Sequence, residues 1–243
     1  MCESIQEYGR AVTMFSKEPG TLEWIDSSLR PGDVFYDIGA NVGIYTIPAA
    51  SQVGPEGAVY AFEPHVANCK SLLENVSRNG LKGRVKVISC ALHNATGFFD
   101  FNYRDWTQGS SMSQLEGHLD PYGEELRLVG TELKFATTLD RLVEQATILP
   151  PTAVKMDVDG NELLILEGMR GILTGDSPPR SIQIEANPED QDALLGVMDA
   201  FGFELTSRHY TALGAQALEE GRAPELIAYN GIFSPKRRGG VDR

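Results

Sequence analysis

The sequence predicts an α/β protein built on a mostly parallel, doubly wound sheet. Two observations support this prediction. Apolar runs of strand length alternate with stretches of helical period from residue 33 onward, and a glycine-rich turn follows the first of these runs. The length of 243 residues suits one such domain, and 42% hydrophobic and 23% charged residues are ordinary for a globular protein.

The first half of the chain predicts three strands separated by two helices. The strands are expected at residues 33–38 (DVFYDI), 58–63 (AVYAFE) and 85–90 (VKVISC), where the runs are apolar and rich in β-branched or aromatic residues. The helices are expected at residues 43–53 and 65–79.

The middle of the chain departs from this alternation. Residues 97–103 (GFFDFNY) and 131–137 (TELKFAT) predict two further strands. The segment 104–130 between them is polar and glycine-rich and has no clear period. Irregular segments of this length inside a compact domain are usually functional or disordered, so we expect a lid-like insertion here.

The second half returns to the α/β pattern and closes the sheet. The expected elements are a short helix at 138–145, a fourth central strand at 152–158, a helix at 162–171, a fifth strand at 181–185 and a helix at 190–201. Residues 203–207 and 225–233 are then expected to form an antiparallel pair. We divide the chain into an N-terminal helical segment (1–30), the main domain (31–235) and a polar tail (236–243).

Composition argues against several classes of partner. The net charge is −13 and the sequence pI is about 4.7, so we expect no nucleic-acid partner and no docking on an anionic membrane. No stretch approaches the length of a membrane span, and the acidic N-terminus does not resemble a signal peptide. The 3 cysteines fit no metal or redox motif, which suits a reducing compartment. A cytoplasmic location is therefore expected.

The turn at residues 37–43 (DIGANVG) lies at the carboxyl end of the first strand, the edge where an open parallel sheet binds its ligand. Gly39 and Gly43 allow close backbone approach, and Asn41 tolerates a left-handed conformation. The spacing differs from the G-x-G-x-x-G of dinucleotide sites, and the carboxylate of Asp37 would repel a pyrophosphate. A cationic ligand such as S-adenosylmethionine is therefore favoured, with backbone amides for its carboxylate.

A second acid supports a nucleoside ligand. Glu63 ends the second strand, where a carboxylate can accept hydrogen bonds from both ribose hydroxyls. The ribose alone does not separate a methyl donor from a nicotinamide cofactor, so the spacing of the turn carries that distinction.

Three blocks of sequence resemble the FkbM family of S-adenosylmethionine-dependent methyltransferases. They are VFYDIGANVGIYTIPAA, VYAFEPHVANCKSLLENVSRNGL and VKMDVDGNELLILEGM, and the resemblance covers about residues 30–190. It implies the Rossmann-like class I methyltransferase fold, with a seven-stranded sheet and an antiparallel last strand. It also implies methyl transfer, most often to oxygen, with sugars, glycan units or polyketide-type natural products as acceptors and 104–130 as the acceptor-binding lid. The family usually has glutamate at the position of Asp159.

The resemblance and the strand ends together predict the site. For donor binding we expect Asp37, Gly39, Ala40, Asn41, Gly43, Glu63, Pro64, Ala91 and Asp157. For catalysis, chiefly as the general base for an acceptor hydroxyl, we expect Asp157, Asp159, Glu185 and His118. No metal site is expected unless the reaction depends on Mg²⁺, which Asp157, Asp159 and Glu162 could hold. Structural roles are also open for two of these acids, a turn cap for Asp159 and helix stabilisation for Glu162.

We therefore expect an O-methyltransferase acting on a small-molecule or glycan acceptor. A second possible acceptor is the carboxylate of a uronic acid, which needs no base but needs basic side chains such as Arg104, Lys134 or Lys155 nearby. A nicotinamide-dependent oxidoreductase and a methyltransferase-fold subunit that binds without catalysis are the competing hypotheses. The sequence does not determine the acceptor or the oligomeric state.

Overall fold

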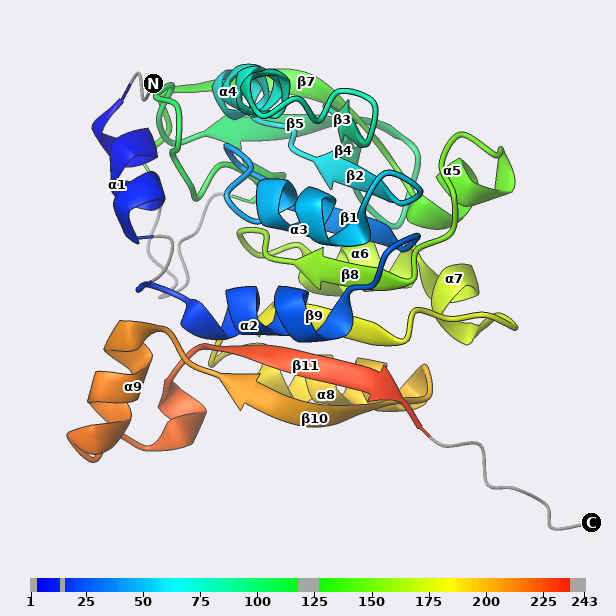
Figure 1. Cartoon of the computed structure of the whole chain (residues 1–243). Coiled ribbons are helices and arrows are strands. Elements are labelled where there is room, and N and C mark those ends of the chain that lie inside the picture. Colours follow the sequence, from blue (N-terminus) through cyan, green and yellow to red (C-terminus); the bar gives the residue numbers. More distant parts are fainter. Residues whose placement is uncertain (1–3, 14–15, 118–126, 237–243) are drawn as a thin grey trace, which may run out of the picture.

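The main sheet of the computed structural model, which describes residues 4–13, 16–117 and 127–236, has seven strands (Figure 1). In chain order they are β1 (Val34–Ile38), β2 (Ala58–Phe62), β3 (Val85–Ile88), β8 (Ala153–Met156), β9 (Ser181–Ala186), β10 (Phe203–His209) and β11 (Tyr229–Pro235). Their order in the sheet is β10-β11-β9-β8-β1-β2-β3. Only β11 runs against the others, because it pairs antiparallel with both β9 and β10. The predicted mostly parallel, seven-stranded sheet with an antiparallel last strand is confirmed.

The direction of chain winding reverses at β1. Strand β1 pairs in parallel with β2 on one side and with β8 on the other, although β8 comes much later in the chain. Such a reversal leaves a crevice at the carboxyl ends of the two central strands. The ligand edge predicted from the first turn is therefore the edge where β1, β2 and β8 end.

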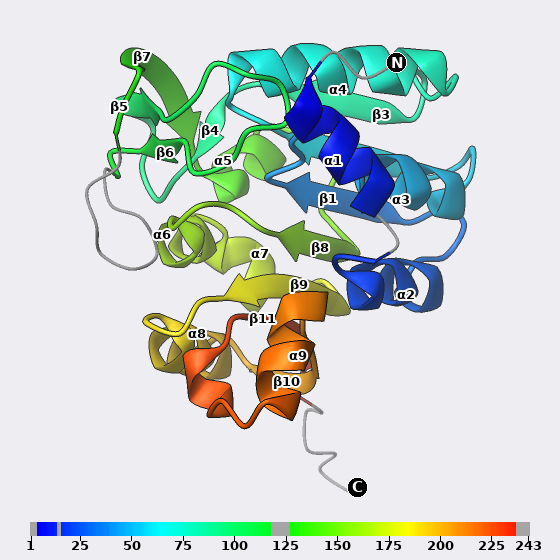
Figure 2. The same ribbon diagram turned by 90° about the vertical axis from the view of Figure 1, so that its left-hand side faces the viewer.

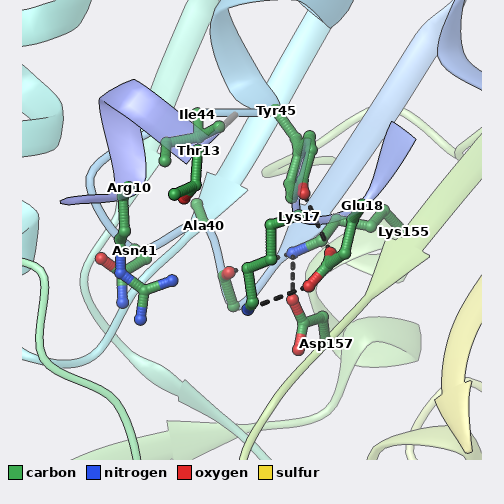
Figure 3. A pocket seen from close by; sticks show the side chains of 11 residues that line it. Arg10, Thr13, Lys17, Glu18, Ala40, Asn41, Ile44, Tyr45, Lys155 and Asp157 are labelled. Carbon is green, nitrogen blue, oxygen red and sulfur yellow. Dashed lines mark hydrogen bonds and ion pairs between the residues drawn. The ribbon is translucent and has the colours of Figure 1, made fainter. Parts of the chain in front are cut away.

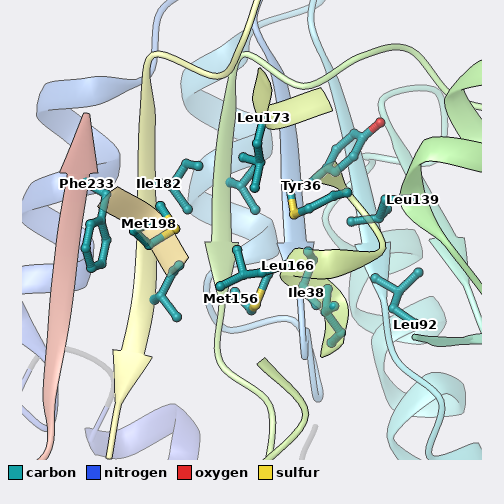
Figure 4. Close-up of a cluster of buried hydrophobic side chains, with 14 of the residues drawn as sticks. Tyr36, Ile38, Leu92, Leu139, Met156, Leu166, Leu173, Ile182, Met198 and Phe233 are labelled. Atoms are coloured by element: carbon teal, nitrogen blue, oxygen red, sulfur yellow. The ribbon is translucent and has the colours of Figure 1, made fainter. Parts of the chain in front are cut away.

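Helices cover both faces of the sheet (Figure 2). They are α2 (Pro19–Ser28), α3 (Thr46–Val53), α4 (Val66–Arg78), α5 (Leu139–Glu144), α6 (Glu162–Glu167), α7 (Arg170–Thr174) and α8 (Gln191–Ala200). Alternation along β1 supplies both cores, since successive side chains of a strand point to opposite faces. Tyr36 and Ile38 join the cluster shown in Figure 4 with side chains of α5 to α8, and Phe35 packs against α2, α3 and α4.

A second, smaller sheet stands beside the first. Its strands are β4 (Ala91–Leu92), β5 (Gly97–Tyr103), β6 (Gln114–Leu115) and β7 (Gly130–Thr137), in the order β4-β7-β5-β6. The strands predicted at 97–103 and 131–137 are confirmed, and they pair antiparallel with each other. The segment predicted to be irregular contributes β6, because Leu115 is buried opposite Phe101 in the small core of this sheet.

Several predicted boundaries were wrong, each for a local reason. The helix expected from residue 43 begins at Thr46, because the backbone at Gly43 has a φ of 91°. The single helix expected at 162–171 is divided into α6 and α7. At the division a Cβ on Gly168 would lie 2.2 Å from the carbonyl oxygen of His93, so two segments meet there. Helix α9 (Ala212–Glu219), capped by Thr211, was not predicted.

The N-terminal helix α1 (Ile5–Thr13) lies at the carboxyl-end edge of the main sheet (Figure 1). Hydrogen bonds join it to the segment 104–111. Ser4 Oγ donates to the carbonyl oxygen of Gln108 at 2.5 Å, and Arg10 Nε donates to that of Gly109 at 2.6 Å. Gly109 has a φ of 83°, and a Cβ there would lie 2.7 Å from the backbone nitrogen of Glu7. The close approach of α1 therefore requires glycine at this position.

A membrane span is not among the described elements: no helix there has the length and apolar character to cross a bilayer.

Candidate functional site

Three adjoining hollows lie where β1, β2 and β8 end, and Gly39 lines all three. The first lies under α1 and is lined chiefly by Arg10, Thr13, Lys17, Glu18, Tyr45, Lys155 and Asp157 (Figure 3). The second is lined chiefly by Glu63, Pro64, His65, Asn68, Ser110 and Asp159. The third is mostly apolar and is lined chiefly by Phe62, Ala91, Leu92, Phe101, Leu115 and Ile165.

The turn after β1 has the backbone that its residue types suggested. Gly39, Asn41 and Gly43 have φ values of 76°, 50° and 91°. A Cβ on Gly39 would lie 1.9 Å from the carbonyl oxygen of Asp157, so the turn after β1 touches the end of β8. Glycine at position 39 is required by this contact as well as by its φ.

Glu63 braces this turn from the end of β2. The backbone N–H of Asn41 donates to Glu63 Oε2 at 2.7 Å, and that of His65 donates to Glu63 Oε1 at 2.8 Å. Burial raises the pKa of Glu63 to about 7, although the two backbone hydrogen bonds oppose that shift. Each carboxylate oxygen can accept a second hydrogen bond, and Glu63 lines the second hollow. Ligand hydroxyl groups in that hollow could use these free positions.

The backbone N–H groups of the turn from Gly39 to Gly43 are already engaged. Those of Gly39 and Ala40 donate to the carbonyl oxygen of Phe62, and that of Gly43 donates to the carbonyl oxygen of Ala40. Glu63 accepts from Asn41, and the Asn41 side chain accepts from the backbone N–H of Val42 at 3.0 Å. The expectation that the turn offers its amides to a ligand carboxylate was therefore wrong for the N–H groups of residues 39–43. These N–H groups donate to acceptors within the protein.

A buried lysine, Lys155 of β8, connects the ends of the two central strands. Its Nζ lies 3.2 Å from Asp37 Oδ1 and 3.4 Å from Asp157 Oδ2, and it donates to the carbonyl oxygen of Gly39 at 3.1 Å. Burial alone would lower the pKa of Lys155, but Asp37 and then Asp157 outweigh it and hold the pKa above its usual value.

The cation that pairs with Asp37 is therefore the side chain of Lys155 and not a ligand. Asp37 is fully buried, and its second oxygen accepts from Thr46 Oγ1 at 2.5 Å. From the sequence, Lys155 was expected only as a partner for an acceptor carboxylate. A lysine inside an apolar strand pattern was the signal for a buried ion pair.

The predicted acids differ in environment. Asp157 has a side chain that is 35% exposed toward the first hollow. Burial raises the pKa of Asp157, but Lys155, Lys17 and Arg10 outweigh that effect and lower it overall. Asp159 lines the second and third hollows and accepts a hydrogen bond from the backbone N–H of Met112. Burial raises the pKa of Asp159 to about 6.

Two further predicted acids are not among the residues that line the three hollows. Glu162 begins α6, and its Oε1 has no hydrogen-bond partner among the described residues. Burial, then the charges of Asp157 and Asp159, raises the pKa of Glu162 to about 8. Glu185 lies near the end of β9, and burial, then the charges of Asp157 and Glu162, raises its pKa well above the usual value.

The remaining predicted residues separate into three groups. Ala40, Asn41, Pro64 and Ala91 line the hollows, as Gly39 and Glu63 do. Asp37 and Gly43 do not line the hollows. Asp37 accepts a hydrogen bond from Thr46, and Gly43 has a positive φ within the turn. His118 lies outside the described residues. Within the described part of the chain, no three His, Cys, Asp or Glu side chains are grouped as a metal ion would require, so the Mg²⁺ set of Asp157, Asp159 and Glu162 is not assembled.

The segment 105–111 closes one side of the second hollow. Asn41 Nδ2 donates to the carbonyl oxygen of Ser110 at 2.8 Å, and Asn68 Oδ1 accepts from the backbone N–H of Gly109 at 2.7 Å. His65 Nε2 lies 2.8 Å from the carbonyl oxygen of Asp105. The predicted lid region is thus attached, through its N-terminal part at 105–111, to the turn and to α4.

The comparison with protein families agrees with this geometry. The family described as the methyltransferase FkbM domain matches residues 37–205. This chain belongs to the FkbM methyltransferase family. The resemblance inferred from the three sequence blocks is confirmed, and helices α1 and α2 lie outside the matched residues.

Two characterised relatives differ in the acceptors that their names give. One is the 31-O-demethyl-FK506 methyltransferase FkbM of Streptomyces tacrolimicus, 28% identical over 173 residues, which are 71% of this chain and 62% of the relative. The other is the hexuronic acid methyltransferase AglP of Haloferax volcanii, 28% identical over 171 residues, which are 70% and 64% of the two chains. The alignments therefore span less than two thirds of either relative.

The fold also resembles that of a solved structure. An rRNA methylase from Streptococcus thermophilus superimposes with a TM-score of 0.51 at 12% identity, and 90% of this chain and 95% of that chain are covered. At this identity the likeness concerns the fold alone.

We predict that replacing Lys155 by methionine destabilises the protein by about 3–5 kcal/mol, because the carboxylate of Asp37 is then buried without its cation. Denaturant unfolding of the purified variant measures this change. Lys82→Met, at an exposed lysine, should stay within about 0.5 kcal/mol of the wild type. A loss as small as that of the control would show that Asp37 does not need Lys155.

We predict that the unliganded protein loses stability as pH rises from about 4.5 toward 8, with Glu162 a main cause. The folded-state pKa of Glu162 lies above its unfolded value, so its contribution is complete below about pH 4.5 and disappears as pH rises through about 8. Glu162→Gln should flatten the dependence and raise Tm at pH 8. Thermal unfolding across this range, with exposed Glu204→Gln as control, tests the prediction. Equal pH dependence in all three proteins would contradict it.

Proposed function

We propose that this protein transfers a methyl group from S-adenosylmethionine to an oxygen atom of a sugar, glycan or polyketide-type acceptor. The observation that carries the proposal is the position of Glu63. Its carboxylate is fixed by two backbone N–H groups and lines the middle of three connected hollows at the switch point of the sheet. Membership of the FkbM family supports the same reaction.

The three hollows match the three parts of the donor in order. The apolar third hollow, with Phe62 and Leu92, suits the adenine ring. The second hollow would place the ribose hydroxyls at Glu63. The first hollow, where Asp157 is ionised and partly exposed, suits the cationic amino acid end.

The reaction itself needs alignment more than activation. An acceptor oxygen attacks the methyl carbon, the bond from that carbon to sulfur breaks, and its electron pair returns to sulfur as a neutral thioether. Holding the three atoms in line can supply several kcal/mol of the barrier. An acceptor hydroxyl must also give up its proton to a base.

Among the described candidates, we assign the base to Glu185. Its neighbour Ile184 pairs with Met156, so Glu185 lies beside Asp157 at the strand ends that border the first hollow. Burial and neighbouring acids raise the pKa of Glu185, whereas Lys155 stabilises Asp157 in the charged form. Asp159 lines the hollows that we assign to the ribose and the adenine, so its role would be on the donor side.

A carboxylate acceptor, as in a uronic acid, is the second candidate. Of the three basic residues named for it, Lys155 is held by Asp37 and Asp157, and Lys134 pairs with Glu132. Arg104 lines an outer groove between α1 and 104–111, together with Lys17, Ser110 and Ser111. This groove, and the name of the relative AglP, favour an anionic sugar as an alternative. The net charge of −13 still disfavours a nucleic-acid acceptor.

We predict that the wild type binds S-adenosylmethionine and S-adenosylhomocysteine but not NADH, as measured by calorimetry. Glu63→Gln should weaken both about 10- to 100-fold, since it removes hydrogen bonds to a charged group. Exposed Glu56→Gln is the matched control and should bind as the wild type does. Circular dichroism checks that the Glu63 variant keeps its fold. Binding of NADH alone would overturn the proposal.

We predict that Glu185→Gln lowers kcat for a hydroxyl acceptor about 10²- to 10⁴-fold, the usual contribution of a general base. It should leave carboxylate esterification nearly unchanged, because that reaction transfers no proton. Release of S-adenosylhomocysteine from a panel of neutral sugars and uronic acids measures both. Exposed Glu189→Gln controls for the loss of surface charge. Full activity of the Glu185 variant on a neutral sugar would place the base elsewhere.

A further inference from the structure

Arg10, on helix α1, lines the site but lies outside the residues that match the family. It precedes the matched residues 37–205. Its side chain nevertheless lines the first hollow, the second hollow and the outer groove. A cation at the junction of these three spaces can meet a ligand in any of them.

The charges around the first hollow are paired, with Arg10 as the exception. Lys155 lies between Asp37 and Asp157, and Lys17 pairs with Glu18 at 3.0 Å. Arg10 donates through Nε to a carbonyl oxygen, that of Gly109. Among the described residues, no carboxylate forms an ion pair with its guanidinium group, and Figure 3 marks no interaction between that group and the other side chains drawn.

The guanidinium group is held in place before any ligand arrives. Its Nε bond to Gly109 and the bond from Ser4 to Gln108 attach α1 to the segment 104–111. That segment is in turn attached to Asn41 and Asn68 beside the donor turn. The two terminal nitrogens of Arg10 therefore stay available at a defined position, and a guanidinium group binds a carboxylate with two parallel hydrogen bonds.

The donor carries a carboxylate for which the turn offers few amides. The N–H groups of Asn41 and Val42 are used by Glu63 and by the Asn41 side chain. We propose that Arg10 binds the carboxylate of the amino acid end of S-adenosylmethionine, with Asp157 facing its ammonium group. This inference rests on the proposed function. It makes α1 a part of the donor site, although α1 lies outside the residues that define the family.

The test compares S-adenosylmethionine with its decarboxylated form, which keeps the sulfonium and ammonium groups and lacks only the carboxylate. Affinities are measured by calorimetry or by displacement of labelled S-adenosylhomocysteine. Arg10→Gln should weaken S-adenosylmethionine about 10- to 100-fold and leave the decarboxylated form unchanged. Arg10→Lys should lose less, because it keeps the charge without the paired hydrogen bonds.

Two control variants separate charge recognition from the docking of α1. Ser4→Ala removes the hydrogen bond from Ser4 to Gln108, which also joins α1 to the segment 104–111, and should preserve the wild-type preference for the carboxylate. Arg104→Gln removes a cation of the outer groove and should also preserve it. Equal loss of both ligands in Arg10→Gln, or no loss, would overturn the inference. A wild type that binds neither ligand would instead overturn the proposed donor.

Discussion

The buried ion pairs of Lys155 are the constraint on which the site depends. One ammonium group holds Asp37 from the end of β1, Asp157 from the end of β8 and the carbonyl oxygen of Gly39 between them. These strands are neighbours only because the winding of the sheet reverses at β1. A buried pair of this kind adds little net stability, but leaving one partner alone is costly. The two strand ends are therefore held in one arrangement.

The second brace, Glu63, makes the site both rigid and acidic. It occupies amides of the turn and stays largely out of water, so its carboxylate is costly to ionise. Asp159, Glu162 and Glu185 share this condition, since each has a pKa raised first by burial and then by neighbouring acids. A cationic ligand would lower the cost of ionising these carboxyl groups, so the site favours it over a phosphate-bearing ligand. The side chains that hold the turn in place are therefore also those that favour a cationic ligand.

Two segments that are remote in sequence cover this acidic edge. Helix α1 and the segment 104–111 bind each other through Ser4 and Arg10, and the segment binds the turn after β1 through Asn41. The matched family region contributes the turn, Glu63 and the acids after β8. The cover over the first hollow comes in part from outside that region.

Local patterns in the sequence were sufficient for the strands of the main sheet and for the turn after β1. Apolar runs placed β1, β2 and β8, and the residue types at Gly39, Asn41 and Gly43 matched their positive φ values. Such features depend on neighbours along the chain. The pairing of Lys155, the division of α6 from α7 at Gly168 and the position of Arg10 depend on residues far apart in the sequence. Only the tertiary structure decided these, because burial and charge compensation are properties of the packed chain.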